Sequence, residues 1–382
     1  MKWLTTILIC CVLALTGLGL VMLYSCSMSM EIAKRAVGAK YLISQLTWCA
    51  MGLVLGAAIA CMDYRRLKTI SPYLLFVAGF LLLLVFAPKI GFGTKGARRW
   101  IAIPGLPHFQ PSEFAKIALI TFLAAYCERF QRQMHTFKQG LVIPSCFIAM
   151  ILALIFIEPD RGCTILLALV SAAMLVIAGV RWKFIIPPMI VALTGLAFSL
   201  WHDPMRLKRI LAWLHPEENK EGVGYQAYEA MLALGSGGWF GLGLGNGRQK
   251  LGFVPEHHTD FIFSIIGEEL GIIATLLVVV AFIALIVCGT IIARRSCDTF
   301  GTLLGLGITF MVGFQAFINI GVVTSTLPNK GMPLPFISYG GSNLLLMLVA
   351  TGLLLSISRF AVEPVRKHRN PFDIPTAELS DA

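Results

Sequence analysis

Long apolar runs separated by short polar segments make up most of the chain. The runs are continuous and roughly 15 to 30 residues long, which suits helices crossing ~30 Å of hydrocarbon. Strands of a membrane barrel would be about half as long and would alternate in polarity. The pattern therefore predicts about ten transmembrane helices, near residues 4–24, 43–62, 71–88, 113–127, 141–157, 162–180, 184–201, 261–292, 301–325 and 343–360.

Composition supports a polytopic membrane protein, because 57% of the residues are hydrophobic and only 13% are charged. A soluble chain of 382 residues could not cover so much apolar surface with so few charges. The first apolar run follows Met1 and Lys2 and is longer than the ~7 to 15 residues of a signal-peptide core, so we expect a retained helix.

Two segments break the regular alternation. Residues 202–260 form one large loop between the seventh and eighth predicted helices, and Tyr225 to Leu234 within it suits a short amphipathic helix. Residues 326–343 are rich in Pro and Gly, which predicts non-helical backbone that packs on protein or lines a wet cavity. We expect one all-α transmembrane domain over residues 1–360 and a disordered cytoplasmic tail over 361–382.

The cations give the orientation and raise a question. An even number of helices places both termini on one side, and Lys and Arg divide about equally between the two sides. The loops on the side of the termini are shorter, so the density of cations favours both termini in the cytoplasm. The presence of many Lys and Arg residues on the outer side then needs an explanation other than topology. Because they are scattered through membrane loops, anionic lipid fits them better than nucleic acid.

Polar side chains recur where several predicted helices meet the outer side. Charges at such positions are costly and commonly line a cavity, so their convergence on one face predicts a site. Simpler interpretations stay open: a local ion pair for Glu113 and Lys116, a turn cap for Asp160, a helix N-cap for Thr259 or Asp260, and an interfacial anchor for Trp100. The groups are Arg99, Glu113, Lys116, Glu158, Asp160, Asp260 and Lys330.

Three other patterns carry little chemistry. GLGLGNG, residues 241–247, follows no predicted strand and opens no βαβ unit, which argues against nucleotide binding. His257 and His258 are adjacent with no further His nearby in sequence, so a zinc site is disfavoured. The ten cysteines form no CxxC pair and lie mostly in predicted helices, where they suit helix packing.

Several motifs together resemble the SEDS family (shape, elongation, division, sporulation). They are GARRWI, QPSEFAK, EPDRG, HTDFIF and PLPFISYGGS, and the likeness runs from the first helix to Arg359. GNGRQKL and the lysine in LPNKG resemble the division branch more than the elongation branch. The resemblance implies a peptidoglycan glycosyltransferase that polymerises lipid II at the outer face of the cytoplasmic membrane, at the division site. It also implies a class B penicillin-binding protein as partner, with other membrane proteins of cell division.

The resemblance assigns the essential aspartate to Asp260. It assigns the outer tryptophan to Trp100 and the polar groups of the cavity to Arg99, Glu113, Lys116, Asp160 and Lys330. We add Glu158 and Ser338, which lie in the same motifs, and His257, which directly precedes HTDFIF, to the predicted substrate-binding residues.

The expected chemistry is a glycosyl transfer from a lipid diphosphate. A carboxylate such as Asp260 can accept the proton of the attacking hydroxyl, and partial burial would raise its pKa into a useful range. Cations must hold the departing diphosphate, and the candidates are Arg99, Lys116, Arg206, Lys208, Arg209 and Lys330. A divalent ion such as Mg or Mn between Asp260 and the diphosphate is compatible with this chemistry, but no ligand set can be identified in the sequence.

Two other classes of function stay open. A lipid II flippase would use a similar polar cavity, although no internal repeat joins the two halves of the chain. A scaffold for division proteins would tolerate loss of the outer carboxylates. Within the enzyme class, an elongation polymerase is the alternative to a division polymerase.

Overall fold

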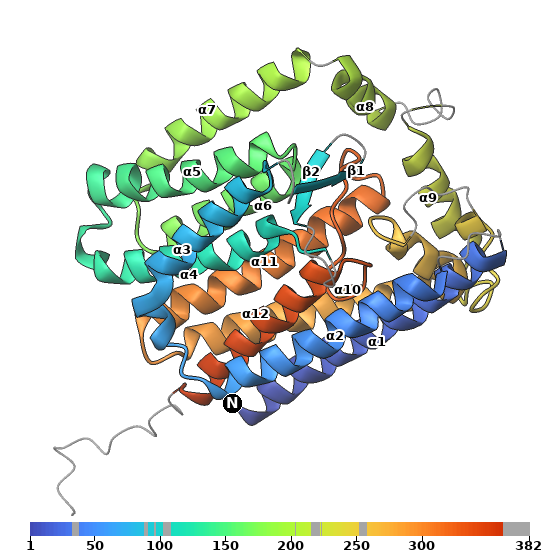
Figure 1. The fold of residues 1–382 in the computed structure, drawn as a ribbon, viewed down its shortest axis with the longest axis horizontal. Helices are drawn as coiled ribbons and strands as arrows, with labels where there is room; N and C mark the ends of the chain where they lie inside the picture. The colour runs from blue at the N-terminus through green and yellow to red at the C-terminus, as the bar shows by residue number, and fades with distance from the viewer. Residues whose placement is uncertain are drawn as a thin grey trace, which may run out of the picture.

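The structure is a computed structural model that describes residues 1–32, 38–87, 91–94, 97–101, 108–202, 204–214, 222, 224–251 and 258–361. Helices dominate these ranges (Figure 1). The α-helices are α1 (Lys2–Ile32), α2 (Gly38–Cys61), α3 (Arg66–Leu84), α4 (Pro111–Arg129), α5 (Ile143–Ile157), α6 (Arg161–Ile177), α7 (Trp182–Trp201), α8 (Pro204–Leu214), α9 (Tyr225–Ser236), α10 (Ile262–Arg294), α11 (Thr299–Val323) and α12 (Gly341–Arg359). A π-helical turn, Lys138–Val142, leads into α5, and 3-10 turns cover Gln131–Gln133 and Gln249–Leu251.

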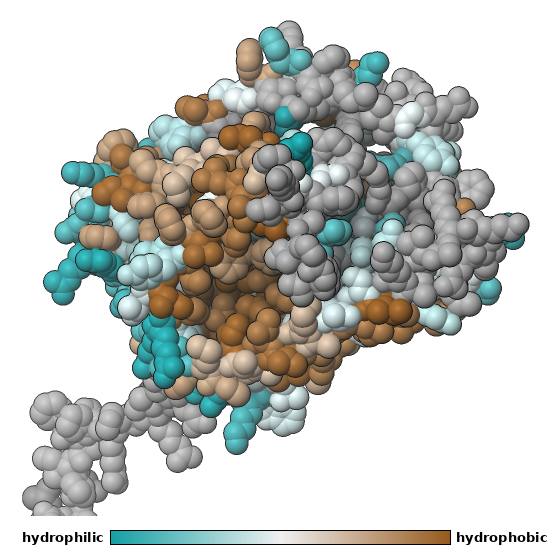
Figure 2. All heavy atoms as spheres, in the orientation of Figure 1, coloured by the Kyte–Doolittle hydropathy of each residue, from teal (hydrophilic) through white to brown (hydrophobic). Residues whose placement is uncertain are grey.

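The helices confirm an all-helical polytopic membrane protein. By length and composition, seven are long and apolar enough to cross a membrane: α1, α2, α3, α5 with its preceding turn, α10, α11 and α12. α6 and the first part of α7 are shorter apolar helices, and α4 carries charged side chains. Each of the ten predicted runs corresponds to one helix. Figure 2 shows a broad apolar band on the surface, with hydrophilic side chains gathered at one end.

Some predicted boundaries and elements were wrong. α1 continues to Ile32, eight residues beyond its predicted end, and α3 begins at Arg66 rather than at residue 71. The predicted helix at Tyr225 is confirmed as α9, but α8 was not foreseen. A small antiparallel hairpin of β1 (Gly91–Thr94) and β2 (Ala97–Ile101) was missed as well. Its strands have only four and five residues, and two of the four residues of β1 are glycines, so they show no pattern of alternation.

Glycines allow the central helices to approach closely. α12 lies against α2, and α1 lies against both α2 and α10 (Figure 1). A Cβ atom built on Gly352 of α12 would lie 2.3 Å from the Gly56 carbonyl oxygen of α2. Backbones meet this closely in membrane bundles where both residues are small, since packing rather than hydrophobicity joins helices in lipid.

α10 is broken at Gly271, although the sequence pattern predicts one continuous helix. Gly271 has φ 78° and ψ −177°, which interrupts the helical hydrogen bonds. The loop after α9 replaces them: Leu242 N donates to Glu268 O (2.9 Å), Gly243 N to Glu269 O (3.0 Å), and Ile272 N to Gly238 O (2.9 Å). The loop thus satisfies backbone groups that the break would otherwise leave unpaired.

Candidate functional site

Asp260 lies just before α10, beside the irregular connection between α11 and α12. Asn319 of α11 donates its Nδ2 to the carbonyl oxygens of Asp260 (2.8 Å) and Met332 (2.6 Å), which ties the two segments together. A Cβ atom built on Gly331 would lie 2.5 Å from Asp260 Oδ2, so a larger residue at this position would displace the carboxylate. The N-cap of α10 is Phe261, and no side chain caps it. Asp260 therefore does not occupy the capping position that we considered for it.

The turn before α6 meets the same connection. A Cβ atom built on Gly162 would lie 3.4 Å from Gly331 O and 3.7 Å from Asp160 Oδ1. Asp160 is the N-cap of α6, accepts from Cys163 N (3.2 Å), and also accepts from Gln110 Nε2 (3.2 Å). Asp160 is therefore a cap and also part of the polar cluster. Gly162 and Gly331 therefore lie close together, with Asp160 near Gly162 and the Asp260 carboxylate against Gly331.

Glu158 is the least satisfied carboxyl group in this cluster. It is fully buried, and neither side-chain oxygen has a hydrogen-bond partner among the described residues. Burial, reinforced by Asp160 and opposed by Arg99, raises its pKa to about 8. Arg99 instead donates to backbone carbonyls, from Nε to Glu158 O (3.2 Å) and from a terminal nitrogen to Pro159 O (2.6 Å). At neutral pH, Glu158 is mostly protonated.

Lys330 supplies a cation next to Gly331. Burial lowers its pKa to about 8; Asp160 opposes the shift and Arg161 adds to it. Lys330 therefore interacts electrostatically with the start of α6, as predicted from the convergence of these segments. The neighbouring Asn329 donates to Gln226 Oε1 at the start of α9 (3.3 Å), which brings that helix to the same cluster.

Glu113 and Lys116 form a buried ion pair inside the bundle, with Nζ and Oε2 2.7 Å apart. Lys116 also donates to Gln315 Oε1 of α11 (3.0 Å), and Asn343 Nδ2 of α12 donates to Glu113 Oε2 (3.0 Å). The pair is local in sequence, but it faces neighbouring helices rather than an interfacial turn. Its charges are satisfied by α11 and α12, so the pair joins three helices below the outer cluster.

The other predicted site residues are less closely associated with Asp260. Trp100 is half-buried on β2 opposite Phe92. Ser338 is buried, and its Oγ accepts from Leu334 N (2.8 Å), so it closes its own turn. α8 is held near the connection between α11 and α12, since Trp213 donates to Ser325 O (2.8 Å). Lys208 on α8 is exposed, whereas the side chains of Arg206 and Arg209, and all of His257, lie outside the described residues.

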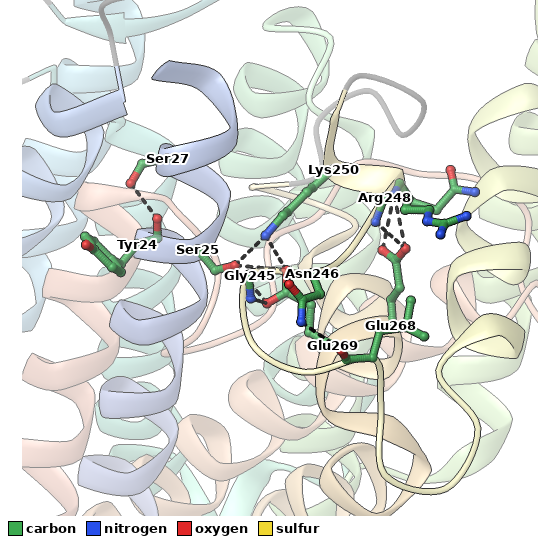
Figure 3. A network of polar contacts seen from close by, with 11 residues as sticks. Tyr24, Ser25, Ser27, Gly245, Asn246, Arg248, Lys250, Glu268 and Glu269 are labelled. Atoms are coloured by element: carbon green, nitrogen blue, oxygen red, sulfur yellow. Dashed lines mark hydrogen bonds and ion pairs between the residues drawn. The ribbon is translucent and has the colours of Figure 1, made fainter. Parts of the chain in front are cut away.

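A second buried network, which we did not predict, holds the loop after α9 (Figure 3). Lys250 Nζ contacts Glu269 Oε1 (2.5 Å) and Ser25 Oγ of α1 (2.7 Å), and Ser25 donates to both Glu269 oxygens. Glu268 accepts from the backbone N–H groups of Arg248 (2.7 Å) and Gln249 (3.1 Å). Two adjacent glutamates within a predicted apolar helix were the available signal, because buried carboxylates need partners.

A metal site does not follow from the described geometry. Within the described ranges, no group of three or more His, Cys, Asp or Glu side chains is placed to hold a metal ion. A divalent cation therefore stays a prediction, with Asp260 as the candidate carboxylate. The described cluster offers the carboxylates of Asp160 and Asp260, the neutral buried carboxyl group of Glu158, and two cations, Arg99 and Lys330. This set suits proton transfer beside an anionic leaving group.

Fold and cluster together define a helical membrane protein with a charged site at one end of its bundle. A family model described as "Cell cycle protein", for FtsW, RodA and SpoVE, matches residues 5–363. The chain therefore belongs to the FtsW/RodA/SpoVE family.

Individual relatives cover nearly the whole chain. It is 42% identical to the probable peptidoglycan glycosyltransferase FtsW of Trichlorobacter lovleyi, over 92% of each chain. It is 37% identical to stage V sporulation protein E of Bacillus subtilis, over 93% of this chain and 97% of the relative.

Solved structures give the same result. A chain from a study of polymerization and crosslinking by a peptidoglycan synthase complex matches with TM-score 0.76 and 26% identity, over 92% of this chain and 96% of that one. The rod shape determining protein RodA of Thermus thermophilus matches with TM-score 0.67 and 25% identity, over 94% of this chain and 97% of that one.

Proposed function

We propose that this protein is a peptidoglycan glycosyltransferase that polymerises lipid II into glycan strands at the outer face of the cytoplasmic membrane, and that it acts in cell division. The observation that carries the proposal is the placement of Asp260 against Gly331, beside the segment that holds Lys330 and the turn that holds Asp160. Relatives named "Probable peptidoglycan glycosyltransferase FtsW" support the reaction and the division branch.

Each residue has a distinct role in the proposed reaction. Asp260 accepts the proton of the acceptor hydroxyl as that oxygen attacks C1 of the donor sugar. The bond from C1 to the diphosphate breaks, and its electron pair leaves with the lipid diphosphate. Lys330 stabilises the added negative charge, and Arg99 together with the cations of α8 provides further contacts to phosphate. Glu158 stays protonated near neutral pH, so it does not repel the leaving group.

Orientation and partner belong to the proposal as well. Both termini lie in the cytoplasm, so that Asp260 faces the outside, where the sugars of lipid II are. A class B penicillin-binding protein crosslinks the strands, which is consistent with a structural neighbour that comes from a peptidoglycan synthase complex. Lipid II serves as both donor and acceptor, and undecaprenyl diphosphate is released.

Polymerisation of purified lipid II tests the function. Wild-type protein reconstituted with its transpeptidase partner should form glycan chains, and Asp260→Asn should form none. Asp63→Asn is the matched control, because Asp63 lies in the connection between α2 and α3, at the other end of the bundle. If neither wild type nor Asp260→Asn forms glycan chains, and Asp260→Asn still transports lipid II across the membrane, the protein is a flippase and not a polymerase.

A further inference from the structure

A cavity of about 450 Å³ lies beside the N-terminal half of α10, apart from the cluster around Asp260. Its lining residues are Ser236, Leu242, Asn246, Arg248, Gln249 and Glu268. Its walls are fixed by the network of Figure 3, in which Glu268 accepts from two backbone N–H groups of the loop. These hydrogen bonds hold the loop against α10, so the shape of the cavity is fixed by buried contacts.

Two groups of the cavity have no partner among the described residues. The guanidinium of Arg248 is exposed and makes no described ion pair or hydrogen bond. The side-chain oxygen of Gln249 is buried and accepts no hydrogen bond. Glu268 is already satisfied, and Asn246 donates to Leu242 O (3.1 Å). A fitting ligand thus carries an anion for Arg248 and a hydroxyl or amide donor for Gln249.

The length of α10 gives the depth of this cavity in the membrane. The part of α10 that follows the break at Gly271 ends at the cations Arg294 and Arg295. From Ile272 to Arg294 the helix rises by 22 residues, or roughly 33 Å, which is about the thickness of the hydrocarbon core. In the proposed orientation, with Arg294 and Arg295 on the cytoplasmic side, Ile272 lies near the outer boundary of the hydrocarbon. Because Ile272 N donates to Gly238 O (2.9 Å), the loop that lines the cavity lies at the same depth.

The same loop exposes large apolar side chains next to the cavity. Trp239 and Phe240 are 71% and 82% exposed, and Leu242 and Leu244 are exposed as well. They lie beside the exposed apolar residues of α10 that begin at Ile272. A polar pocket with a cation, bordered by apolar side chains at the hydrocarbon boundary, matches a lipid with an anionic head group better than a soluble anion.

We infer that this cavity binds an anionic phospholipid of the outer leaflet whose head group carries hydroxyl groups, such as phosphatidylglycerol. Arg248 pairs with the phosphate, Gln249 accepts a hydrogen bond from a head-group hydroxyl, and the segment from Trp239 to Leu244 contacts the acyl chains. The lipid covers the loop that bridges the break in α10. This site does not depend on the proposed reaction.

Lipid binding to the purified full-length protein tests the inference. Phosphatidylglycerol, phosphatidylcholine, undecaprenyl diphosphate and glycerol phosphate are titrated separately, and binding is followed by native mass spectrometry and by the shift in thermal unfolding. Phosphatidylglycerol should bind more tightly than the other three. Arg248→Ala should weaken it at least about tenfold, the scale expected for loss of a charge-assisted hydrogen bond.

Matched variants separate this site from general attraction to lipid. Arg248→Ala keeps the backbone N–H that holds Glu268, so the loop should stay folded. Arg132→Ala removes a cation from a polar cavity near the end of α4 and should leave binding unchanged. Equal affinity for phosphatidylcholine or for glycerol phosphate, tighter binding of undecaprenyl diphosphate, or binding insensitive to Arg248→Ala would each overturn the inference.

Discussion

The buried carboxyl group of Glu158 makes the stability of the protein depend on pH. Its pKa is about 8 in the folded protein, compared with 4.5 for an ordinary glutamate. A difference of about 3.5 units corresponds to roughly 4–5 kcal/mol at 1.36 kcal/mol per unit. Below pH 4.5 the carboxyl is protonated whether the protein is folded or unfolded, so it contributes no difference. As pH rises toward 8, unfolding releases a proton and the free energy of unfolding falls. Above pH 8 the loss is complete.

Glu158→Gln should remove this dependence. The variant and the wild type should have similar stability near pH 4.5. The variant should then be the more stable by roughly 3 kcal/mol at pH 7 and 4–5 kcal/mol above pH 8. The assay is thermal or denaturant unfolding of both proteins in one detergent at pH 5, 7 and 9. Asp160→Asn retains a capping side chain but removes the charge beside Glu158. In proteins that carry Asp160→Asn, the stability difference between Glu158 and Glu158→Gln at pH 7 and 9 should therefore be smaller. If the stabilities of wild type and Glu158→Gln change with pH in parallel, this account of Glu158 is refuted.

Three further variants test the outer cluster and the ion pair beneath it. With a pKa of about 8 for Lys330, polymerisation should slow as pH rises above 8, and Lys330→Arg should move this limb to higher pH, because arginine stays charged. Gly331→Ala places a methyl group 2.5 Å from Asp260 Oδ2, and the displaced carboxylate should lower kcat about tenfold or more with little change in unfolding temperature. Glu113→Gln leaves the buried charge of Lys116 unpaired and should cost about 3–5 kcal/mol in unfolding experiments, most of which Lys116→Met in the same chain should restore.

Lys330→Arg and Gly331→Ala each have a control in the same chain. Gly340→Ala adds a methyl group in the same connection as Gly331, where the nearest atom is 3.6 Å away, and kcat should be unchanged. Lys68→Arg alters a cation paired with Glu128 at the other end of the bundle and should not move the alkaline limb. An unmoved limb in Lys330→Arg, or a double variant as unstable as Glu113→Gln alone, would contradict these assignments.

The membrane helices were predictable because their signal is local. An apolar run of sufficient length must cross the bilayer as a helix, whatever its neighbours are. The convergence of outer polar groups was predictable as well, since topology alone places the ends of these helices on one side. The break at Gly271 was not, because a single glycine in an apolar run resembles a tolerated helix residue.

The chemistry within the cluster depends on contacts between distant segments. Asp160 was readable as a cap, but the full burial of Glu158 follows from packing that no local pattern indicates. Lys250, Glu269 and Ser25 meet across more than 200 residues of sequence. The adjacent Glu268 and Glu269 in an apolar run indicate that buried partners exist, but nothing in the local sequence identifies Ser25 on α1 or Lys250 in the loop as those partners.

The kinetics of the first glycosidic bond test the role of Asp260 most directly. Formation of lipid-linked tetrasaccharide from lipid II is measured in single turnover, together with the affinity for lipid II, for wild type and Asp260→Asn. The account predicts that Asp260→Asn binds lipid II nearly as tightly as wild type but forms the bond at least about a hundredfold more slowly, since a positioned base contributes 10²- to 10⁴-fold. Bond formation at the wild-type rate, or normal turnover at saturating lipid II with weakened binding, would show that Asp260 is not the base.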